Sequence, residues 1–181
     1  QRYWDIESRE HKDNEQQTIE KVHQLVSDAV CRQLISDVPI CTMLSGGLDS
    51  SILTAIAAKQ LSYTDKTLAT YSVAYEGNNE HFQTNAFQTT QDEFWIGKMQ
   101  KRYGTKHTQI ELQQQSLVDA LTEAMRFKDM PSMADIDSSL YLFCKEIKKT
   151  HSVALSGECA DEVFGGYPWF RDLDIRIQDG F

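Results

Sequence analysis

Two short segments of the sequence combine serine, glycine and acidic residues in a pattern suited to phosphate chemistry. The first, Ser45-Gly46-Gly47-Leu48-Asp49-Ser50, follows a short apolar run. Its glycines let the backbone approach a ligand closely, and a helix starting after the turn offers unpaired N–H groups and a positive dipole end. The serines add hydroxyl donors. This segment therefore predicts a phosphate or pyrophosphate site.

Asp49 indicates that a metal takes part, because a carboxylate repels a phosphate unless Mg²⁺ bridges the two. The segment has no Walker A lysine, and the chain contains no GxGxxG pattern. The alternative is a tight turn between a strand and a helix, with Asp49 and Ser50 as helix caps.

The second segment, residues 155–167, repeats this arrangement. Ser156 and Gly157 follow an apolar run, and Glu158 and Asp161 come directly after them. Ligands bind beyond the carboxyl ends of the strands in an open parallel sheet, so two such turns can face each other across a crevice. Asp161 would then share a metal with Asp49. The alternative is an acidic helix start that complements the helix dipole, but the repeated pattern favours the shared site.

The rest of the chain predicts the elements that must position these turns. Apolar residues at three- and four-residue steps indicate helices, and short β-rich runs indicate strands. Gly and Pro mark where these elements end. The expected helices are a first one capped by Asp13 or Asn14 and ending by Asp37, then 50–59, 93–103, 116–125 and 135–149. The expected strands are 40–44, 67–75, 107–112 and 152–155. Strands that alternate with helices predict an α/β fold with an open, mostly parallel sheet and helices on both faces.

Residues 76–91, between the second strand and its helix, are rich in Gln, Asn and Thr. This composition favours a solvated loop, and the alternative is a lid that orders over a bound nucleotide.

Charge and cysteine content exclude several classes of protein. Lys plus Arg number 18 against 27 for Asp plus Glu, a net charge of −9, which argues against a broad nucleic-acid-binding face. No apolar run is long enough for a membrane span. The four cysteines form no CxxC pair, so we expect reduced thiols and a cytoplasmic protein rather than a zinc or redox motif.

The two segments carry a resemblance to a known family. SGGLDS at 45–50 resembles the pyrophosphate-binding loop of the PP-loop ATP pyrophosphatases, which have an adenine nucleotide alpha hydrolase-like fold. LSGECADEVFGGYPWF at 155–170 resembles the second signature of the glutamine-hydrolysing asparagine synthetases, and SDVPICTMLSGGLDSS and TYSVAY agree with it. The resemblance covers nearly the whole chain from about Tyr3.

The resemblance implies a role for individual residues. Val73 would contact adenine, Asp49 and Asp161 would hold Mg²⁺, and Glu158 would support formation of an acyl-adenylate, which makes Glu158, Asp49 and Asp161 the implied catalytic residues. The residues implied to bind ATP are Leu44, Ser45, Gly46, Gly47, Asp49, Ser50, Val73, Ser156 and Gly157.

The implied reaction is ATP-dependent amide formation by a ligase. The side-chain carboxylate of aspartate is adenylated with release of pyrophosphate, and ammonia attacks to give asparagine and AMP. The resemblance implies that a glutaminase domain of the same parent chain supplies the ammonia, and it allows a homodimer of the full-length protein.

Some features depart from the family pattern. The chain begins with Gln1 and contains no glutaminase domain, so we expect residues 1–13 to be a linker from that domain. Residues 14–181 would form the ATP-binding synthetase domain, truncated at its C-terminal end. We expect this chain alone to form little or no product.

Residues 131–139 carry no arginine, whereas well-known members have one in the segment that grips aspartate. Asp135 and Asp137 are expected either to cap the following helix or to face a cationic group of the substrate. The acceptor is therefore aspartate or another carboxylate, such as an antibiotic, peptide or β-lactam precursor. An enzyme that adenylates a tRNA base is disfavoured by the acidic charge, and a non-catalytic ATP-binding module remains a further alternative.

Overall fold

The chain folds around a four-stranded parallel sheet in the computed structural model, which describes residues 2, 5, 7–77, 92–130 and 133–171. The strands are β1 (Ile40–Met43), β2 (Ala69–Tyr75), β3 (Lys106–Leu112) and β4 (Val153–Leu155). They lie in the order β3-β2-β1-β4, and every pair is parallel. The carboxyl ends of β1 and β4 are neighbours, so the segments that follow them emerge at the same edge of the sheet.

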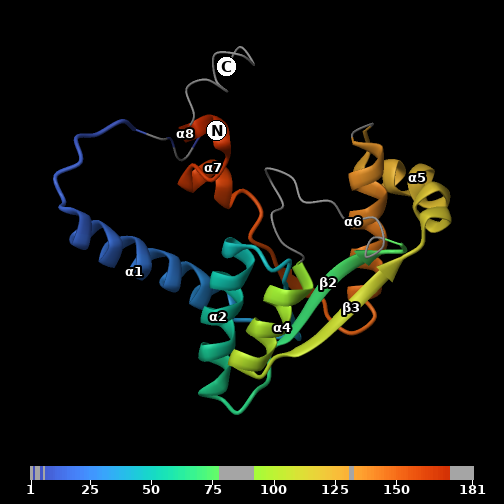
Figure 1. Cartoon of the computed structure of the whole chain (residues 1–181), viewed down its shortest axis with the longest axis horizontal. Helices are drawn as coiled ribbons and strands as arrows, with labels where there is room; N and C mark the ends of the chain where they lie inside the picture. Colours follow the sequence, from blue (N-terminus) through green and yellow to red (C-terminus); the bar gives the residue numbers. More distant parts are fainter. Residues whose placement is uncertain (1, 3–4, 6, 78–91, 131–132, 172–181) are drawn as a thin grey trace.

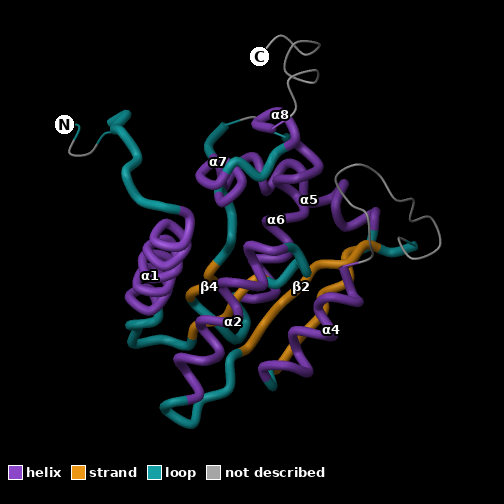
Figure 2. Tube along the Cα trace, turned by 60° about the vertical axis from the view of Figure 1, so that its left-hand side comes forward, coloured by secondary structure: helices purple, strands orange, loops and turns teal. Residues whose placement is uncertain are grey.

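Helices cover both faces of this sheet (Figure 1). On one face lie α2 (Leu48–Ser62) and α4 (Asp92–Tyr103), with α1 (Glu15–Gln33) packed outside α2. On the other lie α5 (Gln114–Lys128) and α6 (Ala134–Ile147). The short helices α7 (Ala160–Phe164) and α8 (Pro168–Arg171) lie beyond the carboxyl end of β4 (Figure 2). The predicted fold class is therefore confirmed.

Two apolar clusters hold the layers together. Val30 of α1 packs with Ala57 and Ala58 of α2 and with Leu68. On the other face of the sheet, the buried side chains of the second cluster come from β1, β2 and α6, namely Cys41, Tyr71, Phe143 and Ile147. Apolar burial of this kind is what fixes each helix against the sheet.

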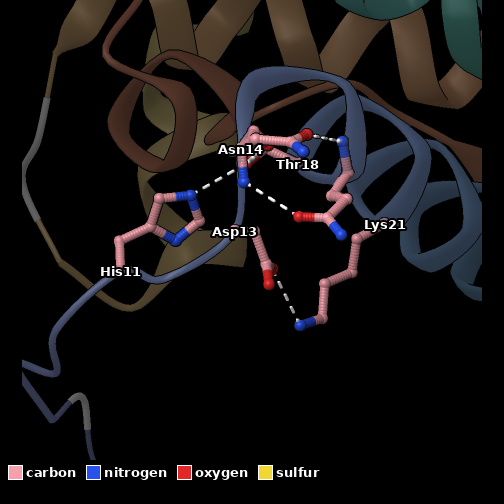
Figure 3. A network of polar contacts seen from close by, with 6 residues as sticks. His11, Asp13, Asn14, Thr18 and Lys21 are labelled. Carbon is pink, nitrogen blue, oxygen red and sulfur yellow. Dashed lines mark hydrogen bonds and ion pairs between the residues drawn. The ribbon is translucent and has the colours of Figure 1, made fainter.

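The first helix begins with a capping box (Figure 3). Asn14 Oδ1 accepts a hydrogen bond from the backbone N–H of Gln17 at 2.9 Å, and Gln17 Oε1 accepts one from the Asn14 N–H at 3.0 Å. Of the two predicted caps, Asn14 is therefore the one used. Asp13 instead pairs with Lys21 at 3.1 Å.

The predicted helices and strands are all present, with shifted ends. The first helix ends at Gln33, and α2 begins at Leu48, which places Asp49 and Ser50 inside its first turn. The N-cap of α2 is Gly47, which has no side chain, so Asp49 and Ser50 are not its caps. Most of the segment predicted as a loop or lid, 78–91, lies outside the described residues. Within the described part of the chain, no helix is both long and apolar enough to cross a bilayer.

Candidate nucleotide site

The loop between β1 and α2 is closed by its own serines. The Ser50 hydroxyl, in a side chain only 7% exposed, accepts a hydrogen bond from the Ser45 N–H at 3.2 Å and lies 3.0 Å from Ser45 Oγ. It also donates to the Gly47 carbonyl at 3.2 Å. The loop's own groups therefore hold its shape, and a loop held in this way loses less entropy when it binds a ligand.

Gly46 is the point at which this loop meets α4. Its φ is +84°, which L side chains adopt at a cost, and a Cβ there would lie 2.8 Å from the Asp92 carbonyl oxygen and 3.3 Å from Trp95 Cβ. Only glycine fits both the backbone conformation and the space. The first turn of α4 thereby fixes the loop from outside.

The second loop, between β4 and α7, lies directly against the first. A Cβ at Gly157 would lie 3.1 Å from both the Asp49 Cβ and the Ser50 backbone nitrogen. Within the loop, the Glu158 N–H donates to Ser156 Oγ at 3.2 Å, and Cys159 takes a left-handed conformation, φ +69°, as the N-cap of α7. The two segments predicted to face each other are thus brought together.

Gly166 fixes the position of Asp161. The Asp161 carboxyl group lies where a Gly166 side chain would stand, and the Gly166 N–H donates to the Asp161 carbonyl oxygen at 3.0 Å. The glycine after α7 therefore leaves room for that carboxylate.

The two loops enclose a cavity of about 300 Å³ at the carboxyl edge of the sheet. Eight of the predicted site residues line it, namely Ser45, Gly47, Asp49, Ser50, Ser156, Gly157, Glu158 and Asp161. The other three lie outside this lining. Leu44 is buried, with its N–H bonded to the Tyr71 carbonyl at 2.8 Å; Gly46 packs on α4; and Val73 packs on the cluster between the sheet and α6.

Sequence reasoning missed part of the lining. Met43, Leu140, Phe143, Cys159, Ala160, Glu162 and Tyr167 also line the cavity. Leu140 and Phe143 come from α6, and no local sequence signal marks a helix that reaches the site from the opposite face of the sheet. Glu162 and Tyr167 belong to the second segment, residues 155–167. Their position in that segment could have indicated that they line the site.

The electrostatics of the cavity are acidic. Burial, and secondly the charge of Asp161, raise the pKa of the Asp49 carboxyl group. Glu158 and Glu162 also line the cavity, and the Tyr167 hydroxyl donates a hydrogen bond to Glu162 at 3.2 Å. That bond, followed by burial and the nearby carboxylates, raises the pKa of Tyr167. A cation would relieve the repulsion among these carboxylates.

The donor set fits a magnesium ion that arrives with a nucleotide. Among the described residues, no three His, Cys, Asp or Glu side chains are grouped to hold a metal by themselves. Asp49 and Asp161 interact electrostatically and so lie near each other. Mg²⁺ is commonly bound by one or two carboxylates plus substrate phosphates, and this pair meets that need.

Residues 131–139, the segment without arginine, do not cap the following helix with an aspartate as predicted. The N-cap of α6 is Met133 and no side chain caps it, so neither Asp135 nor Asp137 is the cap. Asp137 Oδ1 accepts a hydrogen bond from Lys128 Nζ, at the end of α5, at 2.7 Å. The Asp137 carboxylate is therefore neutralised by a lysine of the chain itself. Residues 131–132 of this segment lie outside the described residues.

Comparisons with known proteins agree with this geometry. The family model described as asparagine synthase matches residues 21–180. The chain is 54% identical over 176 residues to glutamine-hydrolyzing asparagine synthetase 3 of Bacillus subtilis, covering 97% of this chain and 29% of that protein. It is 30% identical over 160 residues to glutamine-hydrolyzing asparagine synthetase 1 of Arabidopsis thaliana, covering 83% of this chain and 25% of that protein. The chain thus spans less than a third of the length of these relatives.

One solved structure shows a similar fold. It is a glutamine-dependent NAD⁺ synthetase from Acinetobacter baumannii in complex with ADP, with a TM-score of 0.53 and 18% identity. The match covers 90% of this chain and 29% of that one. At this identity the likeness supports the fold class alone.

Proposed function

Because this chain belongs to the asparagine synthase family, we propose that it supplies the ATP-binding centre of a ligase that adenylates the side-chain carboxylate of aspartate. The observation that carries the proposal is the contact between Gly157 and the Asp49–Ser50 backbone. This contact joins two strand-to-helix loops into one cavity at the edge of a parallel sheet where ligands bind.

We assign the first loop to the pyrophosphate part of ATP. Its backbone N–H groups and the Ser45 and Ser50 hydroxyls would hold the phosphate oxygens, together with Gly46 and Gly47. Ser156 and Gly157 would contact ATP from the second loop. Leu44 and Val73 would bound the adenosine part, although neither lines the cavity itself.

Asp49 and Asp161 are the residues that would hold Mg²⁺. Bound there, the ion supplies positive charge that offsets the negative charge of the pyrophosphate leaving group. The raised pKa of Asp49 supports this assignment, because a nearby cation would offset the burial and the Asp161 charge that raise it.

The proposed reaction has two steps. A carboxylate oxygen of aspartate attacks the α-phosphorus of ATP, and the bond from that phosphorus to the pyrophosphate oxygen breaks. Ammonia then attacks the acyl carbon, loses a proton, and displaces AMP as the C–O bond breaks. Glu158, on the cavity wall, would support formation of the acyl-adenylate.

The remaining proposals concern the whole protein. We propose that residues 1–13 are a linker and that 14–181 belong to the synthetase domain. Ammonia would come from a glutaminase domain of the same parent chain, the full-length protein could form a homodimer, and its location would be cytoplasmic.

One observation favours a carboxylate other than that of aspartate as the substrate that is adenylated. Residues 131–139 contain no arginine, and Asp137 is already paired with Lys128. The described part of this segment supplies no cation for an α-carboxylate, so a different carboxylate is the second candidate for the same chemistry.

Labelled oxygen tests the proposal in the full-length parent protein. Aspartate carrying ¹⁸O in its side-chain carboxylate is incubated with ATP, Mg²⁺ and glutamine, and the AMP is analysed by mass spectrometry. Adenylation transfers one ¹⁸O atom to AMP, and asparagine forms in equal amount. Unlabelled AMP in the presence of asparagine would exclude the acyl-adenylate, and turnover that requires another carboxylate would favour the second candidate.

A further inference from the structure

A second cavity of about 300 Å³ lies at the opposite edge of the sheet from the nucleotide site. It opens at the amino ends of β2 and β3 and beside the end of α6. Its lining is Ala69, Tyr71, Lys106, Thr108, Ile110, Glu146, Lys149, Thr150 and His151. No residue of this lining also lines the nucleotide cavity.

A network of three side chains fixes one wall of this cavity. The Tyr71 hydroxyl lies 2.8 Å from Thr150 Oγ1 and 3.0 Å from His151 Nδ1, and Thr150 Oγ1 lies 3.0 Å from the same Nδ1. Tyr71 is only 8% exposed, so this wall is anchored in the core. The His151 ring is thereby held through Nδ1, with its Nε2 atom available.

The charged groups of the cavity leave it with a net positive charge. Lys149 Nζ pairs with the Glu146 carboxylate at 2.6 Å, which accounts for one lysine and one acid. Among the described residues, neither Lys106 Nζ nor His151 Nε2 has a hydrogen-bond or ion-pair partner. Lys106 is exposed, so its ammonium group is the unpaired positive charge that this lining presents to solvent.

Helix stabilisation explains only part of this pattern. Lys145 in the last turn of α6 and Lys148 at its C-cap complement the negative end of the helix dipole, and Lys149 follows directly after them. Lys106 belongs to β3 and gains nothing from that dipole. In addition, the N–H groups of Lys148, Thr150 and His151 bond to carbonyls of the last turn of α6. These carbonyls therefore do not need a lysine side chain as a hydrogen-bond donor.

We propose that this second cavity binds a small oxyanion carried on a short apolar group. Lys106 Nζ would offset the charge of the anion, and Thr108 and His151 would offer hydrogen bonds. Ala69, Ile110 and the Tyr71 ring form an apolar wall for the rest of the ligand. The site does not depend on the function proposed for the other edge of the sheet.

Phenyl phosphate is a suitable probe because it combines an oxyanion with an apolar group. We expect titration of the ¹⁵N-labelled chain, with ATP·Mg²⁺ present to occupy the nucleotide site, to shift the amide signals of Lys106, Thr108, Thr150 and His151. Inorganic phosphate should shift the same signals with weaker affinity, because it leaves the apolar wall unused.

Lys106→Met keeps the side-chain stem and removes the charge, and no partner is left unpaired. It should weaken phenyl phosphate binding at least tenfold, as loss of a charge-assisted contact does. Lys101→Met, on the exposed side of α4, is the matched control and should bind as the parent does. Three results would overturn the proposal: no shifts at these residues, shifts confined to residues 45–50, or equal affinity in Lys106→Met. The NMR spectrum of each variant shows whether it is folded. Thr108→Val is a second variant, and it should also weaken phenyl phosphate binding.

Discussion

Gly157 lies so close to Asp49 that a single added carbon would stand 3.1 Å from the Asp49 Cβ. These residues are more than a hundred positions apart in the sequence, and each follows a strand of the same sheet. Their contact is what turns two ordinary strand-to-helix turns into one cavity. Disturbing that contact should affect the nucleotide site before it affects the fold.

Gly157→Ala should therefore separate the two loops. The new methyl group meets backbone atoms of Ser50 and Asp49, which cannot give way as a flexible side-chain end would. We expect a loss of stability of about 1–3 kcal/mol and a weakening of ATP·Mg²⁺ binding that exceeds tenfold. Chemical denaturation and calorimetric titration measure the two effects.

Gly97→Ala is the control for that substitution. Gly97 lies inside α4, and nothing stands within 4 Å of where its Cβ would be. This change should stabilise the protein by about 0.5–1 kcal/mol, since alanine favours a helix interior. Unaltered ATP binding by Gly157→Ala would contradict the role of the loop contact.

Gly46→Ala tests the contact between the first loop and α4. Gly46 and Gly104 both have positive φ, +84° and +62°, so alanine at either position costs about 1–2 kcal/mol in backbone strain. Only Gly46 also faces a backbone oxygen, at 2.8 Å, whereas Gly104 has nothing within 4 Å. Gly46→Ala should therefore destabilise more than Gly104→Ala in denaturant unfolding. Equal losses would show that the packing against α4 carries no weight.

A buried hydroxyl pair joins β1 to α2. Thr42 Oγ1 and Thr54 Oγ1 lie 2.9 Å apart, and both side chains are completely buried. Thr54→Val leaves the Thr42 hydroxyl without its partner and should cost about 1–3 kcal/mol. The double variant Thr42→Val with Thr54→Val should be nearly as stable as the parent, because no polar group is then stranded. A double-mutant cycle of unfolding free energies measures this, and additive losses would contradict it.

His107 should make stability depend on pH. Its Nδ1 lies 2.9 Å from Thr70 Oγ1, its Nε2 lies 3.1 Å from Ser72 Oγ, and burial lowers its pKa. As pH falls below about 6.5, the unfolded chain binds a proton that the folded state resists, so stability falls. The slope from this group cannot exceed about 1.4 kcal/mol per pH unit.

His107→Gln removes that titration while keeping a polar side chain. Urea unfolding at about pH 7.5 and pH 5.5, on either side of the ordinary histidine pKa, compares the two proteins. The free energy of unfolding of His107→Gln should fall less than that of the parent when the pH is lowered from about 7.5 to about 5.5. The same loss in both would mean that His107 does not titrate differently on folding.

The local elements were predictable because their signals are local. Apolar periodicity marks α1, and the run Ile40–Met43 ahead of Ser45 marks a buried strand entering a glycine turn. The closeness of Asp49 and Gly157 was also predictable, since parallel strands deliver their carboxyl ends to one edge.

Contacts across layers were not predictable. The lining by Leu140 and Phe143 depends on how α6 lies on the far face of the sheet, and the pairing of Asp137 with Lys128 depends on how α5 meets α6. Capping of α6 by Asp135 or Asp137 was wrong because the helix begins before both residues, at Ala134, with Met133 as its N-cap.

The cavity between the two loops is proposed to carry out the adenylation of aspartate. ATP–pyrophosphate exchange by the full-length parent protein, with and without aspartate, tests it most directly, and Asp49→Asn serves as the control. We predict exchange that requires aspartate and Mg²⁺ and is lost in Asp49→Asn. Absence of aspartate-dependent exchange in a preparation that still binds ATP·Mg²⁺ would contradict adenylation of aspartate at this site.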